Sequence, residues 1–271
     1  MKKFKLNSKQ IKELKNILRN YELRDLNKYT KLINRLKSTQ DDVQKKQIEQ
    51  ELHAPYKNFS NNERDVNRFL EILDVDYCPY CNINDVMAVV DEYGRRLCRP
   101  DFDHFEPQST HPEKQVTYDN LVPSCLLCNQ RLKGEKEFSD QNYLNPYKLD
   151  FDSIMEFKLI LKGVNYLNEK NFDVEIHPRS KAKKNEVECA KNNIREFALD
   201  KRYKLYNKEI VPILRRLALY NNVCKKKEIM KILDSATPLP FRNILFPDEN
   251  CEINKTRLGK LKKDVLKKFL K

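Results

Sequence analysis

The stretch RPDFDHFEPQSTHPEKQVTYDNLVPSCLLCNQRLKG, Arg99 to Gly134, carries the features from which the fold of this chain is inferred. It joins polar side chains typical of a metal or catalytic site to a pair of cysteines on one short segment: Asp103, His104, Asn120, Cys125, Cys128 and Asn129. The question is whether these residues belong to a small structural zinc module or to a site that performs chemistry.

A second cysteine pair, Cys78 and Cys81 in CPYC, precedes this stretch. Two Cys-x-x-Cys pairs are typical of a closed tetrahedral zinc site, in which four thiolates hold the metal and leave no position for substrate. A redox Cys-x-x-Cys would need a thioredoxin-like βαβ context, and plain buried thiols do not predict two matched pairs. We therefore expect structural Zn²⁺ at Cys78, Cys81, Cys125 and Cys128.

The rest of the composition indicates a soluble, cytoplasmic protein without a membrane partner. The N-terminus has no apolar signal core, and the longest apolar run is Val86–Val90. The remaining cysteines are then expected to be reduced structural thiols: Cys98, Cys189, Cys224 and Cys251.

The formal charge of +13 lies mainly at the two ends of the chain. Residues 1–20 and 253–271 are rich in Lys and Arg, and such segments attract a polyanion through counterion release. An equally acceptable interpretation is that both are solvated faces of terminal helices.

Periodicity predicts an α+β protein with three regions: 1–74, mainly helical; 75–148, a small core clamped by the zinc site; and 149–271, a hairpin followed by mainly helical sequence. The first helix is expected to start at an N-cap Ser8. A hairpin is expected between Val86 and Phe105, turning at Gly94, and a second one from the runs IMEFKLIL and FDVEIH. Pro212 is expected to break or kink a C-terminal helix.

A short α-helix is predicted from about Ser124 to Lys133, ending at Gly134. On an α-helix, Cys125, Cys128 and Leu132 would face the zinc and the core, while Asn129 and Lys133 would share an adjacent face. Strict strand alternation would point Asp103 and His104 to opposite sides, so the strand must end or bulge there, or the two must approach a substrate from different sides.

The polar residues of the stretch suit hydrolytic chemistry. His is the side chain best suited to take a proton from water near neutral pH, and Asp and Asn oxygens are ligands for a hard cation such as Mg²⁺. Asp103, His104 and Asn129 supply that set.

In this order the motifs resemble those of the HNH endonucleases, whose ββα-metal core runs Cys-x-x-Cys, Asp-His-x-x-Pro, Asn-Leu, Cys-x-x-Cys and a basic residue. The matching segments are CPYC, DHFEP, NLVPSC, CLLCN and RLKG. The resemblance implies that His104 is the general base, that Asp103 and Asn129 hold a catalytic Mg²⁺ or Mn²⁺, and that Asn120 orients the His104 loop. Many members have His where this chain has Asn129, which puts the metal preference rather than the activity in question.

The segment after the motif, including NYLNPY, looks like that of HNH proteins in retron-associated and Septu-type anti-phage systems, which act beside an ATPase partner. The resemblance implies a DNA endonuclease of bacterial defence, with RNA a less favoured substrate. Two alternatives stay open: a non-catalytic zinc-ribbon module that binds nucleic acid, and a nuclease subunit that is latent until an ATPase binds it.

Lys133, Arg131 and Arg99 are candidates for phosphate contacts, against a simple role as solvated charges. Asp101 is a weaker candidate for assisting the metal, against a role in capping the hairpin. His111 is a weaker candidate for a substrate contact, against simple exposure in its loop. His53 and His177 have no partner by motif.

Overall fold

The computed structural model describes residues 1–270, except for residues 23–25, 94, 164, 166, 225, 237 and 238. Its N-terminal part is helical, as predicted, and comprises α1 (Ser8–Leu18), α2 (Leu26–Ser38), α3 (Asp42–Asn61) and α4 (Glu63–Leu73). The cap of α1 is Asn7 rather than Ser8, because the Asn7 side chain accepts from the Gln10 amide while the Gln10 side chain accepts from the Asn7 amide. This reciprocal pair satisfies two N-terminal donors.

The strands form three separate antiparallel pairs: β1 (Val89–Val90) with β2 (Arg96–Cys98), β3 (Asp101–His104) with β4 (Leu121–Ser124), and β5 (Met155–Leu161) with β6 (Phe172–Pro178). The β5–β6 pair confirms the second predicted hairpin. The first prediction was wrong in its extent, because the hairpin ends at Cys98 and the strand carrying Asp103 and His104 pairs with β4 instead. Pro100 separates the two strands and has no amide to donate to a continuing ladder. The turn residue Gly94 lies outside the described residues.

The C-terminal part is helical from Lys184, as predicted, and comprises α6 (Lys184–Glu196), α7 (Leu199–Lys204), α8 (Asn207–Cys224), α9 (Lys227–Ser235), α10 (Phe241–Leu245) and α11 (Gly259–Phe269). A short helix that was not predicted, α5 (Phe151–Ile154), precedes β5. Helix α8 continues through Pro212, so the predicted break does not occur. Short 3-10 turns connect the elements: η1 (Pro112–Lys114), η3 (Glu169–Asn171), η4 (Pro247–Asn250) and η5 (Ile253–Lys255). The side chain of Cys224 lies outside the described part of the chain, whereas Cys98, Cys189 and Cys251 are free thiols.

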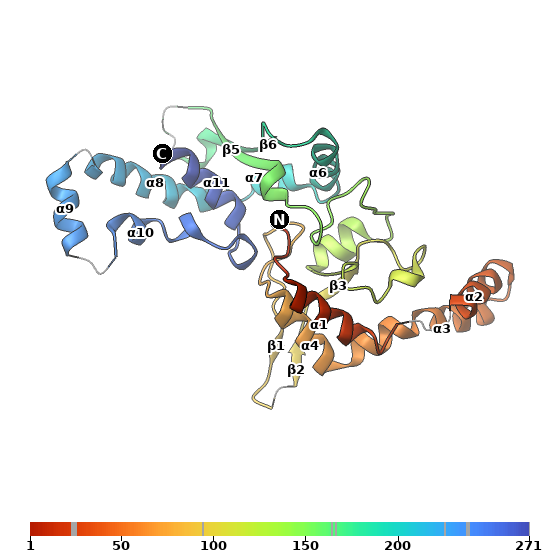
Figure 1. Ribbon diagram of the computed structural model, residues 1–271. Coiled ribbons are helices and arrows are strands. Elements are labelled where there is room, and N and C mark those ends of the chain that lie inside the picture. Colours follow the sequence, from red (N-terminus) through yellow and green to blue (C-terminus); the bar gives the residue numbers. More distant parts are fainter. Residues whose placement is uncertain are drawn as a thin grey trace.

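One hydrophobic core extends from Met1 to Leu270 and includes the four motif cysteines, so the three predicted regions share a core. Figure 1 shows α2 and the start of α3 projecting from the body on one side, and α8, α9 and α10 on the other. The projecting part has a small cluster of its own, made by Tyr29, Leu32, Ile48 and Leu52.

Several basic side chains of the C-terminal segment are paired with acidic groups of the protein. Lys260 is fully buried and its ammonium lies 2.8 Å from Asp152 and 2.5 Å from Asp264. Arg257 pairs with Glu209 at 2.9 Å, and Lys255 pairs with Asp74. The C-terminal segment is thus a packed part of the fold rather than a free basic arm.

No helix in the described ranges combines the length and apolar character needed to cross a membrane.

Candidate metal centre and Asp-His site

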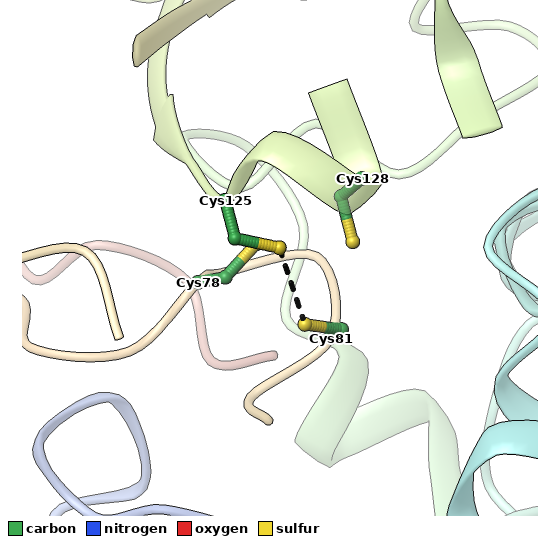
Figure 2. A group of neighbouring side chains, drawn as sticks. All are labelled: Cys78, Cys81, Cys125 and Cys128. Carbon is green, nitrogen blue, oxygen red and sulfur yellow. Dashed lines mark hydrogen bonds between the residues drawn. The ribbon is translucent and has the colours of Figure 1, made fainter. Parts of the chain in front are cut away.

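The four motif cysteines converge in one buried cluster, as predicted. Cys78 and Cys81 lie in the loop between α4 and β1, while Cys125 follows β4 and Cys128 lies in the next helix. Their sulfur atoms all lie within 4.8 Å of one another, and those of Cys81 and Cys125 are 4.0 Å apart (Figure 2). A zinc ion with Zn–S bonds of about 2.3 Å needs sulfur–sulfur separations of roughly 3.8 Å. The donor set therefore fits structural zinc.

Two side chains from outside the motif, one amide and one guanidinium, donate hydrogen bonds to these sulfur atoms. Asn84 donates to Cys125 Sγ at 3.3 Å, and the Arg202 guanidinium donates to Cys128 Sγ at 3.4 Å. Burial alone would raise the pKa of the Cys81 thiol, but hydrogen bonds from the neighbouring thiols and the charge of Arg202 hold it well below its usual value. These surroundings favour the thiolate, which is the form that binds metal, at Cys81. In contrast, burial raises the pKa of the Cys78 thiol and the hydrogen bond with Cys125 raises that of the Cys128 thiol.

The helix after β4 is a π-helix, η2 (Leu127–Lys133), and not the predicted α-helix. It ends with the Gly134 amide donating to the Asn129 carbonyl at 2.8 Å, a bond between residues five apart. Five-residue spacing brings Lys133, rather than Leu132, to the same buried side as Cys128. Lys133 is 2% exposed, whereas Leu132 is only partly buried, so the predicted division of faces was wrong.

Lys133, predicted to contact phosphate, bonds groups inside the protein in this arrangement. Its ammonium donates to Asp103 Oδ1 at 2.8 Å and to the His104 carbonyl at 2.6 Å. The Tyr80 hydroxyl donates to the other Asp103 oxygen, Oδ2, at 2.6 Å. Burial and the Asp103 charge raise the pKa of Tyr80 well above its usual value, so the phenol keeps its proton and remains a donor.

The contacts of Asp103 occupy the oxygens that were expected to bind a catalytic cation. Both carboxylate oxygens of Asp103 are bonded and its side chain is 3% exposed, so Asp103 does not fit a divalent ion while Lys133 holds this position. Asn129 is half-buried, and within the described part of the chain its side-chain amide makes no hydrogen bond. A catalytic metal at Asp103 and Asn129 therefore stays a prediction.

His104 lies on the other side of β3 from Asp103, as strand alternation requires, and β3 ends at His104 in regular register with Leu121. Its Nε2 lies 3.0 Å from the Gln115 carbonyl, and its ring packs edge-on against Tyr56 of α3 with centroids 4.5 Å apart. A carbonyl only accepts, so Nε2 carries the proton and Nδ1 keeps its lone pair. Burial lowers the pKa of His104 to about 4, partly opposed by the Gln115 bond, so the imidazole is neutral near pH 7.

Asn120 holds the loop that follows His104. Its side-chain oxygen accepts from the Glu106 amide at 2.7 Å, and its nitrogen donates to the Glu106 carbonyl at 3.0 Å and the Lys114 carbonyl at 3.1 Å. Asn120 is 3% exposed, so these bonds are protected from water.

The other predicted polar residues lie nearer the surface. Arg131 is exposed, and Arg99 is half-buried with its guanidinium donating to Ser60. Asp101 is exposed and accepts from Gln130 at 2.8 Å. His111 bonds Glu137 at 2.9 Å, His177 bonds Glu175 at 2.8 Å, and burial lowers the pKa of His53.

Taken together, fold and site define an α+β protein that has a buried cluster of four cysteines with the geometry of a metal site, a buried Asp103 and a half-buried His104. No protein-family model matches the chain. The chain is similar to the Septu protein PtuB of Bacillus thuringiensis, with 31% identity over 99 residues. These residues make up 36% of this chain and 35% of that protein, so the similarity covers about a third of each.

Several residues at the site were missed from sequence: Tyr80, Gln115, Tyr56 and Arg202. Tyr80 lies inside the CPYC motif, and its position between Cys78 and Cys81 was a usable signal. Gln115, Tyr56 and Arg202 reach the site only through tertiary packing, so no local pattern indicated them.

Proposed function

We propose that the protein is an HNH-type endonuclease that hydrolyses phosphodiester bonds of DNA. The observation that carries the proposal is a neutral His104 whose Nε2 is bonded to the Gln115 carbonyl, which leaves Nδ1 to accept a proton. Asn120 supports the role by fixing the backbone immediately after His104.

In this proposal His104 Nδ1 takes a proton from a water molecule as its oxygen attacks phosphorus. The new P–O bond forms in line with the bond that breaks, and the leaving oxygen departs with the other product and takes up a proton. The non-bridging oxygens carry negative charge, for which the exposed Arg131 and the half-buried Arg99 are the proposed partners.

The proposal includes a divalent cation, Mg²⁺ or Mn²⁺, whose binding requires a rearrangement at Asp103. Asn129 offers an amide oxygen, but Asp103 contributes an oxygen only after Lys133 releases it. Structural zinc at the four cysteines is a separate part of the proposal and rests on the fit of the sulfur cluster.

Similarity to a Septu protein supports a role in anti-phage defence. An ATPase partner follows from the family resemblance and is proposed on that basis. The sealed Asp103 and the covered His104 favour a nuclease that is latent in the isolated chain, and DNA is favoured over RNA as substrate.

The test is cleavage of supercoiled plasmid with Mg²⁺ or Mn²⁺ by the wild type, His104→Ala and His177→Ala. His177 is a matched control because it pairs with Glu175 on β6, away from the motif. Zinc content and melting temperature are measured for all three proteins. We expect the wild type and His177→Ala to nick under the same conditions, either alone or after the co-encoded ATPase is added, and His104→Ala to lose activity at least about a hundredfold.

Equal cleavage by all three proteins would exclude His104 as the base. A wild type that cuts only after its co-encoded ATPase is added would establish the latent form. Inactivity under both conditions, with zinc bound and the fold intact, would favour a binding module.

A further inference from the structure

Helix α3 belongs to two hydrophobic clusters. Its first half contributes Ile48 and Leu52 to the small cluster with α2, whereas Phe59 near its end belongs to the main core, with its ring 5.7 Å from that of Phe102. We call residues 26–54 the arm, which projects from the body in Figure 1. The junction between arm and core falls at Pro55.

Pro55 weakens the helix at this junction. It has no amide proton, and its ring crowds the carbonyl four residues earlier. In an uninterrupted α-helix the Tyr56 amide would bond the Leu52 carbonyl. Both of these groups bond a side chain from outside the helix, that of Gln115.

Gln115 is fully buried and spans the junction. Its side-chain nitrogen donates to the Leu52 carbonyl at 2.9 Å, and its side-chain oxygen accepts from the Tyr56 amide at 3.3 Å. Tyr29 of α2 adds a second link from the arm, because its hydroxyl donates to the Leu52 carbonyl at 2.6 Å and also bonds the Gln115 side chain. The same nitrogen also lies 2.9 Å from the Pro112 carbonyl of its own loop, so its two N–H groups are shared among the Leu52 and Pro112 carbonyls and the Tyr29 hydroxyl.

The backbone of the same residue orients His104. The Gln115 carbonyl is the partner of His104 Nε2, and Tyr56, whose amide bonds the Gln115 side chain, places its ring against the imidazole. Thus one buried side chain holds the arm and its backbone carbonyl holds the ring. A movement of the arm at Pro55 would shift both contacts of His104 at once.

We propose that Gln115 is a positioning residue for His104 and that, through it, the arm sets the orientation of the imidazole. The inference rests on the proposed nuclease function for its consequence, but the coupling itself is a property of the fold. Through this coupling, a substrate or partner that moves the arm would change the orientation of the His104 ring.

The test compares Gln115→Met, Tyr29→Phe and Gln44→Met in the full zinc-loaded chain. Met keeps the length of Gln without its hydrogen bonds, and Phe keeps the Tyr29 ring within the arm cluster while removing its hydroxyl. Gln44 is exposed at the far end of the arm, so Gln44→Met is the matched control.

Three measurements are made on each protein: hydrogen exchange of segments 53–60 and 112–117, the ¹⁵N signals of the His104 ring, and steady-state plasmid cleavage. We expect Gln115→Met to speed exchange in both segments, to change the Nε2–H signal, and to lower kcat about tenfold to a hundredfold with KM within about twofold. Tyr29→Phe should act in the same direction by a smaller factor, and Gln44→Met should match the wild type.

Unchanged ring signals and kcat in Gln115→Met, with the arm exchanging faster, would overturn the proposal. If Gln115→Met exchanges fast throughout and is therefore unfolded, Tyr29→Phe decides, and wild-type ring signals in that variant would overturn it. A wild type that cleaves neither alone nor with the co-encoded ATPase would end the proposed function, whereas the ring signals and exchange would still decide the coupling.

Discussion

His104 is a titratable side chain whose properties come from what covers it. Burial lowers its pKa from 6.5 to about 4, so between these values the unfolded chain binds a proton that the folded chain does not. The stability contributed by the neutral ring is fully present above pH 6.5 and is lost as the pH falls towards 4. Between pH 7 and pH 5 this amounts to about 2 kcal/mol.

We therefore expect the free energy of unfolding of the wild type to fall by about 2 kcal/mol more than that of His104→Gln over this range. Urea titrations at several pH values measure the free energy of unfolding of both proteins. Because both contain the same cysteine cluster, the pH dependence of that cluster drops out of the difference between them. Parallel curves for the two proteins would contradict the burial of the imidazole.

Lys133 and Asp103 form a buried pair whose members depend on each other. Removing one partner leaves an uncompensated charge, which typically costs about 3–5 kcal/mol, whereas removing both costs less. We expect Lys133→Met to destabilise the protein by this amount and the added change Asp103→Asn to recover more than half of it. Additive effects in a double-mutant cycle would show that the two groups do not interact.

At the scale of the element, α7 contacts the cysteine cluster through Arg202. Loss of a donor to a metal ligand typically lowers metal affinity about tenfold to a hundredfold. We expect Arg202→Gln to release zinc faster by a factor in this range in a colorimetric chelator assay. Arg257→Gln, which removes a half-exposed pair with Glu209, serves as the control and should release zinc at the wild-type rate.

Some elements follow from sequence because their information is local. The spacing of two Cys-x-x-Cys pairs predicted the sulfur cluster, and two strand-like runs predicted the β5–β6 hairpin. The pairing of β3 with β4 was missed, since it joins segments across a long polar loop. The π-helix was missed as well, because a bond five residues apart has no signal that separates it from an α-helical pattern. Lys133 was consequently assigned to the wrong side of its helix.

For the whole molecule, the cysteine cluster lies inside the core that runs from Met1 to Leu270. Four thiols held this close without a metal would repel as they ionise, and the loops that carry them lose their common anchor. We expect zinc removal by a chelator to lower the melting temperature by more than about 10 °C and to affect the N-terminal and C-terminal helices together.

Differential scanning calorimetry of the metal-loaded and chelated forms provides the measurement, with circular dichroism as the second probe. Adding Zn²⁺ back should restore the melting temperature of the metal-loaded form and a single unfolding transition. A transition that is insensitive to the chelator would show that the cluster is not a metal site.

The five-residue turn that buries Lys133 also affects how relatives of this chain are compared. A π-turn corresponds to one extra residue in an α-helix, so a relative with an ordinary helix here would be one residue shorter after its last cysteine. An alignment without a gap would then place a surface residue opposite Lys133. Homologues should therefore be searched for a lysine four or five positions after that cysteine. A spacing of five would indicate the π-helix, and a spacing of four would indicate an α-helix.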